Sequence, residues 1–291
     1  MVVIHRFVVV PKVAHPWYDE VRAGAESQAR VLGEQLGGIV EVEFLCPPAV
    51  GVAEQNATLQ RACESRPSGV ALDPVDAMDH LPALKALETA GIPLVLFDAP
   101  SPAAGSTSVG NCFAEQGEIA AERLAELLGH AGKIALMHGC PTAPNHRQRH
   151  AAQLRVLAKY PEITVVDGGT DNDSIETART EAAAVLEAHP DLRGYLCCDA
   201  SGPIGIARAI EEAGRVGTVK VVSMDGIRPI LEAVKEGIIE ASAATIPHMQ
   251  GSMAVLMLWQ ATLGVALPKF VDTGIDLITK DNVDAYLARS I

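Results

Sequence analysis

Acidic and aromatic side chains follow several apolar runs of the sequence, at points where a strand would end. Asp98, Asp199 and Asp225 each come directly after such a run or its last residue. The adjacent pair Trp17 and Tyr18 follows the first run, in a chain with only 4% aromatic residues. Ionised carboxylates accept hydrogen bonds from hydroxyl groups, and aromatic planes cover the apolar CH faces of sugars. The combination indicates a site for a neutral polyhydroxy ligand.

Two arginines add hydrogen-bond donors to this set. Arg147 and Arg149 lie on the segment between a predicted strand and the helix that follows it, and a guanidinium group donates bidentately. An aspartate after a strand also serves as a helix cap, so one such residue does not define a site. Several polar groups that converge at one place favour ligand binding over capping.

The sequence lacks the motifs of common nucleophilic enzymes. No GxSxG motif occurs, and His138, His146 and His150 have no evident nucleophile partner beyond Cys140. Residues 129–133 depart from the phosphate-binding loop in glycine spacing and lack its Ser or Thr. We therefore predict no catalytic residue and no cofactor.

Six cysteines form neither a dense disulfide framework nor a pair with zinc-binding spacing. Adjacent cysteines rarely bridge each other, so Cys197 and Cys198 are interpreted as the end of a buried strand. A metal site built from Cys198, Asp199 and His138 is the alternative to that interpretation. We predict free thiols and no bound metal.

The charge balance narrows the class of partner. The chain has 23 Lys and Arg against 36 Asp and Glu, which gives a formal net charge of −13. Nucleic acids and anionic membrane surfaces bind mostly through Lys and Arg, so both are disfavoured. We expect small molecules or basic partners and no nucleic acid.

The N-terminal run does not have the pattern of a secretory signal, and no apolar stretch approaches the ~20 residues of a transmembrane helix. Two interpretations stay open at this point. The protein works in the cytoplasm, or a leader has been removed from an exported chain.

Short β-branched runs alternate with longer amphipathic stretches along the chain. Strands are predicted at residues 7–10, 39–45, 69–72, 94–97, 133–137, 164–166, 194–197, 219–223 and 240–244. Helices are predicted around 21–32 and at 54–63, 81–90, 115–128, 148–159, 174–188, 204–212, 229–236 and 249–263. A stretch rich in Pro, Gly and Ser at 100–110 interrupts the alternation. Because parallel strands need crossover helices, the pattern predicts an α/β fold with two doubly wound parallel-sheet lobes.

Ligands of open parallel sheets lie outside the carboxyl ends of the strands. By that rule, we expect the strand-end aspartates, the aromatic pair and the arginines to lie at the carboxyl ends of the strands, where ligands bind. The elements therefore position the groups named above for one ligand.

Several motifs occur in an order that carries a specific resemblance. They are Pro11–Tyr18 followed by Val21–Ala25, Phe97-Asp98, Arg147-Gln148-Arg149, Gly194–Asp199, Val222–Gly226, and Ala244–Pro247 with Gly251. In this order, covering nearly the whole chain, they resemble the type I periplasmic sugar-binding proteins, the ribose-binding-like solute receptors of ABC importers.

The resemblance implies roles for individual residues. Trp17 and Tyr18 fall where the family has aromatics that touch the sugar ring, and Asp98, Arg149 and Asp225 fall on its principal hydrogen-bonding positions. The ligand-binding residues predicted in this way are His15, Trp17, Tyr18, Asp98, Arg147, Arg149, Asn172, Asp199, Asp225 and Thr245.

The chain departs from ribose receptors at five of the corresponding positions. His15 and Asp199 stand where Asn is expected, Thr245 where Gln is frequent, Ala99 where an Arg is found, and Asn172 where an aromatic is common. These departures argue against ribose and leave open a smaller polyol, another pentose or hexose, or an amino sugar. Asp199 would suit a cationic group if Arg147 and Arg149 leave its charge unpaired.

The resemblance also implies the domain organisation and the partners. We expect an N-terminal lobe of residues 1–109 plus 246–272, a C-terminal lobe of 110–245 plus 273–291, and a ligand cleft between them. Three crossings, near 109–111, 244–245 and 271–274, would join the lobes as a hinge. The implied protein is a monomer, periplasmic or in the cell envelope with its leader absent. It would deliver its ligand to a membrane ABC permease after the lobes close.

Two other classes of function stay open on the sequence. A ligand-sensing module for signalling or transcription, such as a chemoreceptor feed or a lactose-repressor-like effector core, would share the fold. An enzyme of doubly wound fold that acts on a small metabolite is the third class. Neither has a motif of its own in this chain.

Overall fold

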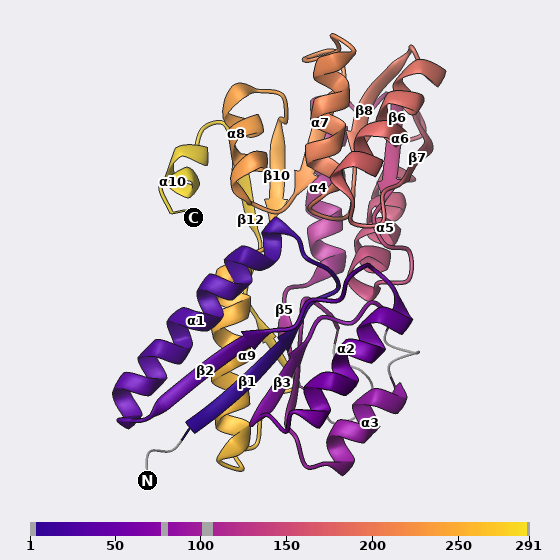
Figure 1. The fold of residues 1–291 in the computed structure, drawn as a ribbon. Coiled ribbons are helices and arrows are strands. Elements are labelled where there is room, and N and C mark those ends of the chain that lie inside the picture. Colours follow the sequence, from indigo (N-terminus) through magenta and orange to yellow (C-terminus); the bar gives the residue numbers. More distant parts are fainter. Residues whose placement is uncertain (1–3, 77–80, 101–106, 290–291) are drawn as a thin grey trace. The chain divides into compact units, whose positions relative to one another are not determined.

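A computed structural model describes residues 4–76, 81–100 and 107–289 and divides the chain into two compact units (Figure 1). Unit 1 comprises Met1–Asn111 and Pro247–Thr273, and unit 2 comprises Cys112–Ile246 and Gly274–Ile291. The predicted lobe boundaries, at 109/110, 245/246 and 272/273, precede these by one or two residues. Each unit is an α/β layer structure with a six-stranded sheet.

Unit 1 has a fully parallel sheet in the order β11-β5-β4-β3-β1-β2. Its elements are β1 (Ile4–Val10), α1 (Pro16–Leu36), β2 (Ile39–Phe44), α2 (Val52–Glu64), β3 (Gly69–Leu72), α3 (Leu81–Thr89), β4 (Leu94–Phe97), β5 (Thr107–Gly110), α9 (Pro247–Thr262) and β11 (Phe270–Asp272). Helices α1 and α9 cover one face of the sheet, and α2 and α3 cover the other (Figure 1).

Unit 2 has the sheet order β12-β10-β9-β8-β6-β7, in which the edge strand β12 is antiparallel and all other pairs are parallel. Its elements are α4 (Phe113–Leu127), β6 (Gly132–His138), α5 (Pro144–Leu157), β7 (Ile163–Thr170), α6 (Ile175–Ala188), β8 (Leu192–Leu196), α7 (Gly202–Glu212), β9 (Lys220–Met224), α8 (Arg228–Glu236), β10 (Ala241–Ala244), β12 (Asp276–Thr279) and α10 (Val283–Leu287). The two-sheet α/β prediction is confirmed.

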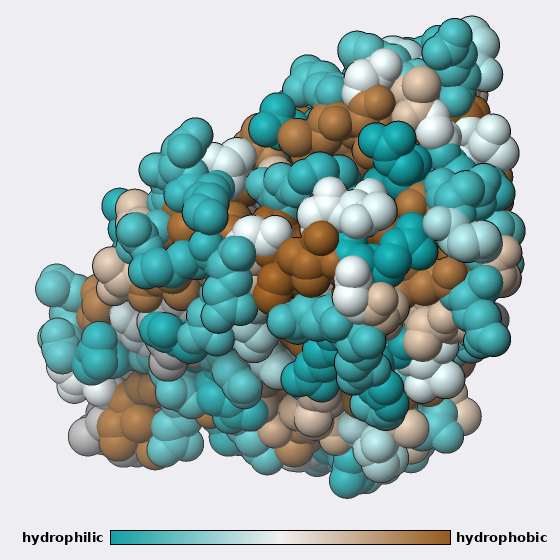
Figure 2. All heavy atoms as spheres, turned by 90° about the horizontal axis from the view of Figure 1, so that it is seen from above, coloured by the Kyte–Doolittle hydropathy of each residue, from teal (hydrophilic) through white to brown (hydrophobic). Residues whose placement is uncertain are grey.

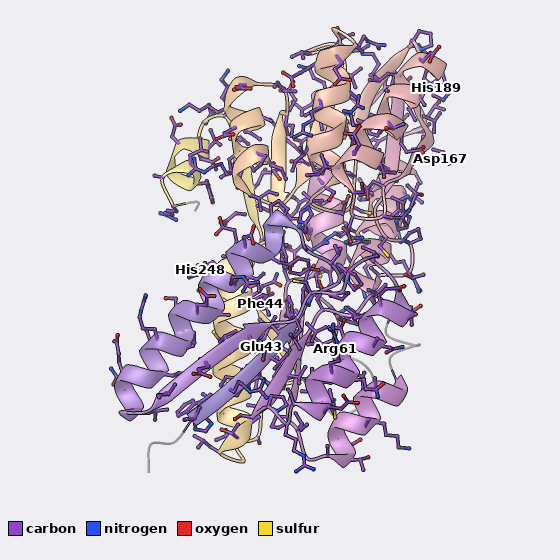
Figure 3. All side chains as sticks on the ribbon, viewed as in Figure 1. Glu43, Phe44, Arg61, Asp167, His189 and His248 are labelled. Carbon is purple, nitrogen blue, oxygen red and sulfur yellow. The ribbon has the colours of Figure 1, made fainter. Side chains whose placement is uncertain are left out.

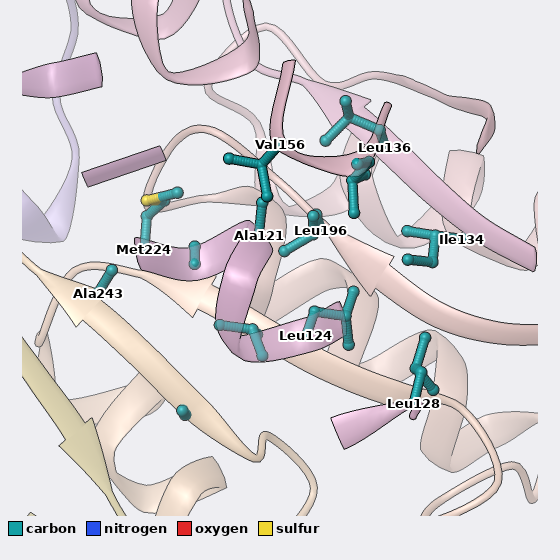
Figure 4. Packing of buried hydrophobic residues seen from close by; sticks show 13 residues of the cluster. Ala121, Leu124, Leu128, Ile134, Leu136, Val156, Leu196, Met224 and Ala243 are labelled. Carbon is teal, nitrogen blue, oxygen red and sulfur yellow. The ribbon is translucent and has the colours of Figure 1, made fainter. Parts of the chain in front are cut away.

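The core of unit 2 lies between its sheet and the helices α4 and α5 (Figure 4). Leu124 of α4 and Val156 of α5 pack with Leu196 and Met224 of the sheet, and all four are almost fully buried. Unit 1 has an equivalent cluster in which Leu59 of α2 packs on the strands. Burial of both sheet faces explains why central strands such as β3 and β4 are continuous apolar runs.

Glycine permits a close helix contact within unit 1. A Cβ atom on Gly24 of α1 would overlap the carbonyl oxygen of His248, and one on Gly251 of α9 would overlap that of Val21. The two helices therefore approach backbone to backbone, which fixes α9 on the sheet of this unit.

Three expectations about local structure are wrong. Residues 107–110 were expected in a loop but form β5, because the strand is buried between β4 and β11 and pairing overrides its Thr-Ser-Val-Gly composition; residues 101–106 of that loop lie outside the described residues. Arg147 and Arg149 were expected between the strand and its helix, although the range predicted for that helix, 148–159, already included Arg149; both lie on α5, which begins at Pro144. Asp199 lies three residues beyond the end of β8 rather than directly after it.

Hydrophilic residues cover most of the face shown in Figure 2, with hydrophobic residues between them. Large exposed apolar side chains include Ile4 at the start of β1 and Leu263 directly after α9. Within the described ranges, no helix combines the length and apolar character that crossing a membrane requires.

Candidate functional site

Unit 1 buries an ion pair at the carboxyl ends of β1 and β3. The Lys12 ammonium lies 3.3 Å from Asp73 Oδ2, and both side chains are at most 4% exposed. The Tyr18 hydroxyl donates to the same carboxylate oxygen at 2.6 Å and accepts a hydrogen bond from the Lys12 backbone N–H at 3.2 Å. The carboxylate is thus compensated by an opposite charge and a hydroxyl donor, as a buried charge requires.

Gln55 of α2 connects the two loops that carry this ion pair. Its side-chain amide donates to the carbonyl oxygens of Pro11 and Asp73 at 2.9 and 2.7 Å. Its Oε1 atom accepts from the backbone N–H of Val75 at 2.8 Å. The fully buried amide fixes both strand ends relative to each other.

The predicted aromatic pair lies at the start of α1. His15 is the N-cap of this helix, because its Nδ1 atom accepts from the Trp17 backbone N–H at 3.1 Å. Trp17 and Tyr18 meet edge to face with ring centroids 5.2 Å apart, and Tyr18 meets Phe97 of β4 in the same way at 6.3 Å. Both rings are about 95% buried, so they pack within the protein at this edge.

Asp98 of unit 1 and Asp225 of unit 2 occupy equivalent places in their sheets. Each directly follows a central strand and has a positive φ, 45° and 68°, which L-residues rarely adopt. The Asp98 N–H donates to the Val109 carbonyl at 2.9 Å, and the Asp225 N–H donates to that of Ala243 at 3.2 Å. Strained backbone that recurs at two strand ends is typical of functional positions.

Asp225 is further fixed by its neighbours in β10 and after it. The Thr245 hydroxyl donates to Asp225 Oδ1, and the Ser242 hydroxyl donates to the Asp225 backbone carbonyl. All three residues are at least 96% buried. The structure therefore brings the predicted residues Asp225 and Thr245 into direct contact.

Arg149 is buried on α5 and held by groups from α4 and from the segment after β8. Its Nε–H donates to Gln116 Oε1 at 2.6 Å, and Nη1 donates to the Cys198 carbonyl at 3.4 Å. The Gln116 amide donates in turn to the Ala243 carbonyl at 2.8 Å, and the guanidinium lies 5.0 Å from the centroid of the Phe113 ring. This arrangement orients a permanently charged donor at the carboxyl edge of the unit 2 sheet.

Arg147 differs from Arg149 although both lie in the first two turns of α5. Arg147 is exposed, because residues two apart lie on different faces of a helix. A Cβ atom on Gly117 of α4 would overlap the backbone carbonyl of Arg149. The glycine therefore allows α4 to approach α5 at the turn that carries Arg149.

Asp199 forms a helix cap in unit 2. Its Oδ2 atom accepts from the backbone N–H groups of Ser201 and Gly202, at 3.0 and 3.2 Å, at the start of α7. Its side chain also contacts that of Asp171, which follows β7. Burial raises the pKa of both carboxyl groups. Asp199 and Asp173 raise the pKa of Asp171 further, whereas Asp173 raises and Asp171 lowers the pKa of Asp199.

Asn172 is exposed, and its neighbours on both sides carry the polar contacts of this loop. The Asp173 N–H donates to Asp171 Oδ1 at 2.8 Å. His146 Nδ1 accepts from the Cys140 N–H at 2.8 Å, so its proton lies on Nε2, 3.9 Å from Asp173 Oδ1. The predicted role of Asn172 stays a prediction.

His138 and His150 stack with ring centroids 4.3 Å apart, and His138 Nδ1 lies 3.7 Å from Cys198 Sγ. Burial and the neighbouring His150 lower the pKa of His138 to about 4. All six cysteines are free. Among the described residues, no group of three or more His, Cys, Asp or Glu side chains is arranged to hold a metal ion.

Comparison with known proteins decides the family. The sequence model of the family described as "Periplasmic binding protein domain" matches residues 6–264, which is most of the chain. The chain belongs to this family.

Relatives of this family differ in how much of the chain they match. The D-ribose/D-allose-binding protein of Pseudomonas aeruginosa is 29% identical over 177 residues, 58% of this chain and 55% of that protein, so the match spans about half of its length. The D-allose-binding periplasmic protein of Escherichia coli is 23% identical over 265 residues, 87% of this chain and 83% of that protein.

A solved structure of the same fold matches nearly the full length. It is an ABC transporter solute-binding protein from Burkholderia graminis in complex with D-arabinose, with a TM-score of 0.90 and 27% identity. The alignment covers 97% of each chain. The family fold therefore extends over both units.

The ten predicted residues fall into two groups within this family fold. Unit 1 contains His15, Trp17, Tyr18 and Asp98, and unit 2 contains Arg147, Arg149, Asn172, Asp199, Asp225 and Thr245. The prediction omitted Lys12, Asp73 and Asp171, although each contacts a predicted residue. Lys12 and Asp73 contact Tyr18, and Asp171 contacts Asp199. Asp73 and Asp171 follow strands and were within reach of the same rule, whereas Gln55 and Gln116 lie inside helices and give no signal in the sequence.

Proposed function

We propose that this protein is a solute-binding receptor that captures a sugar or polyol with residues of both units and delivers it to an ABC importer permease. The observation that carries the proposal is the full-length similarity to a solute-binding protein in complex with D-arabinose. The buried polar groups at the carboxyl edge of each sheet support it, because this edge is where open parallel sheets bind ligands.

The roles we propose follow from the chemistry of each group. Asp98 and Asp225 accept hydrogen bonds from ligand hydroxyls, and Arg149 donates to ligand oxygens. Trp17 and Tyr18 border the apolar face of the ring, with His15, Arg147, Asn172, Asp199 and Thr245 as the remaining contacts. The proposal includes no chemical step on the ligand.

We further propose a periplasmic or cell-envelope location and a monomeric state. A receptor of this kind meets its ligand outside the inner membrane and closes over it, and the closed form is the one that the permease binds. The name of the Escherichia coli relative, a periplasmic binding protein, supports the location.

Calorimetric titration against a panel of pentoses, hexoses and polyols tests the proposal. We expect at least one of them to bind and to raise the melting temperature. Arg149→Ala and Asp225→Ala should each weaken that binding by about 2–5 kcal/mol, because each leaves buried partners unpaired.

Arg155→Ala is the matched control, since Arg155 lies on the same helix α5 but pairs with Glu118 at the surface. It should leave the affinity unchanged. Absence of binding across the whole panel would overturn the proposed function. Wild-type affinity in both Arg149→Ala and Asp225→Ala would instead overturn the site.

A further inference from the structure

Unit 2 buries two carboxyl groups against each other at the ends of β7 and β8. Asp171 is 0% exposed and Asp199 is 1% exposed, and one carboxyl oxygen of each lies beside the same residue, Gly202. Two ionised carboxylates in contact repel each other strongly when water is excluded. Their juxtaposition therefore needs a compensating positive charge or a proton.

One oxygen of each carboxyl group has a donor and the other does not. Asp199 Oδ2 accepts from two backbone N–H groups, and Asp171 Oδ1 accepts from that of Asp173. Asp199 Oδ1 and Asp171 Oδ2 receive no hydrogen bond from any described group. Both of these oxygens face Gly202, where a Cβ atom would lie 2.8 Å from the first and 3.1 Å from the second.

The surrounding elements supply no cation to the pair. From the loop after β7 comes Asp173, and from α5 comes His146, whose Nε2 atom faces Asp173. Strand β8 and the residues after it contribute Tyr195, Cys197 and Cys198, whose pKa values burial raises, so they are neutral. The guanidinium of Arg149 donates to Gln116 and to the Cys198 carbonyl. No described Lys or Arg forms an ion pair with Asp171 or Asp199.

We propose that Asp171 and Asp199 share one proton between their facing oxygens, and that Asp171 is the positioning residue that holds Asp199 through it. Asp171 is the donor, because Asp199 already accepts two N–H groups that favour its ionised form. The ligand role of Asp199 rests on the proposed function, whereas the shared proton does not.

The shared proton predicts a dependence of stability on pH. The folded pair keeps a proton that the unfolded chain releases above pH ~4, the ordinary range of aspartate. Folding therefore takes up a proton between that pH and the raised pKa of the pair, and the unfolding free energy falls as the pH rises through this window. In the limit of one proton, the unfolding equilibrium constant increases about tenfold per pH unit.

Denaturant unfolding of the ligand-free protein from pH 5 to pH 9 tests the proton itself, with Asp171→Asn as the key variant. Its amide donates to Asp199 without titrating, so the ratio of wild-type to variant unfolding constants should rise with pH. Groups common to both proteins, including the histidines, cancel in this ratio. Asp191→Asn, at an exposed residue paired with Lys133, is the control and should give a constant ratio.

Asp199→Asn should remove the same pH dependence as Asp171→Asn, because one proton belongs to both groups. This variant replaces Asp171→Asn if the latter does not fold. NMR titration of the wild-type carboxyl carbons should show an aspartate that ionises above pH 6. Parallel pH profiles of wild type and both variants, or no such carboxyl, would overturn the shared proton.

The positioning role is tested with whichever carbohydrate of the panel binds. At pH 6, Asp171→Asn should keep the affinity within about twofold, and Asp171→Ala should lose about tenfold or more, because it leaves a buried acceptor unpaired. Equal losses in both variants would overturn the positioning role. If no carbohydrate binds, the proposed function fails while the ligand-free arm still decides the shared proton.

Discussion

Asp73 of unit 1 lies 3.3 Å from the Lys12 ammonium, whereas Asp199 of unit 2 faces the carboxyl group of Asp171. Both aspartates are buried close to the end of a parallel strand, β3 or β8. An internal cation compensates the first charge, and we infer that a proton compensates the second. The carboxyl ends of the two sheets therefore carry similar residue types but differ in which group compensates the buried carboxylate. A cation keeps its charge across neutral pH, but a proton can leave.

The largest expected effect comes from removing the cation of the buried Lys12–Asp73 ion pair. Lys12→Met should lower the unfolding free energy by about 3–5 kcal/mol, because it leaves Asp73 buried without its opposite charge. Denaturant unfolding measures the loss. Lys133→Met, which breaks the exposed pair with Asp191, should cost less than about 1 kcal/mol. Equal costs for the two lysines would show that burial does not govern the value of these pairs.

The double variant Lys12→Met, Asp73→Leu separates the effect of the unpaired charge from that of packing. Removing both charges leaves no unpaired group, so its stability should lie well above that of Lys12→Met alone. A double variant as unstable as the single one would mean that packing around Lys12, rather than the charge of Asp73, explains the loss.

Glycine contacts should respond alike in the two units, since they depend on shape and not on charge. Gly24→Ala in unit 1 and Gly117→Ala in unit 2 should each cost about 1–3 kcal/mol, because the added Cβ overlaps a backbone carbonyl of the facing helix. Denaturant unfolding at constant pH is the measurement. Glu34→Ala, on the exposed side of α1, is the control; a loss of similar size there would exclude the overlap as the cause.

Hydroxyl donors to the buried carboxylates should contribute less to the unfolding free energy than the ion pair does. Tyr18→Phe removes the donor to Asp73, and Thr245→Val removes the donor to Asp225. Each should lower the unfolding free energy by roughly 1–2 kcal/mol, the cost of a lost hydrogen bond to a charged group. Tyr286→Phe, at a partly exposed phenol of α10, serves as the control. No loss in Tyr18→Phe would mean that Lys12 alone satisfies Asp73.

The smallest expected effect is a second pH response of unit 2, opposite in sign to that of the carboxyl pair. His138 has a pKa of about 4 in the folded chain, so it is neutral there while the unfolded chain binds a proton below pH ~6.5. Its contribution to stability is present above that pH and is lost as the pH falls toward 4. Because the side chain is partly exposed, we expect only about 1 kcal/mol after solvent screening.

His138→Gln should therefore flatten the acid side of the unfolding profile between pH 7 and pH 4. His189→Gln, at the C-terminal end of α6, is the control (Figure 3). Asp167 lies on β7 and its charge acts against the lowering, so Asp167→Asn should lower the pKa of His138 further (Figure 3). An NMR titration of the His138 ring checks both statements, and a His138 that titrates near 6.5 would contradict them.

Apolar strands were the most predictable part of the fold. The predicted bounds of β3 and β4 agree with the structure, because each is a continuous buried run with no competing helical period. The start of α5 could not be predicted in the same way. Its buried face carries Asn145, His146, Arg149 and Gln153, so hydrophobic periodicity is lost where the helix begins.

The candidate site was predictable residue by residue but not in its contacts. The strand-end rule located Asp98 and Asp225, whose backbone conformation then proved to be shared. It did not predict that Lys12 pairs with Asp73, or that Asp171 faces Asp199, because these partners come from different strands. Gln116 and Gln55 support the site from inside helices, where a polar residue is usually taken to face water.

The sequence by itself determined the α/β class, the two parallel sheets and the strand ends at which polar groups gather, because alternation of apolar runs and amphipathic stretches is a local property. Only the tertiary structure decided which charge neighbours which. The energy of a buried carboxyl group depends on the distance to its partners and on the exclusion of water, and both are set by residues far away in the chain. For that reason, similar aspartates at two sheet edges have a lysine as neighbour in one unit and another carboxyl group in the other.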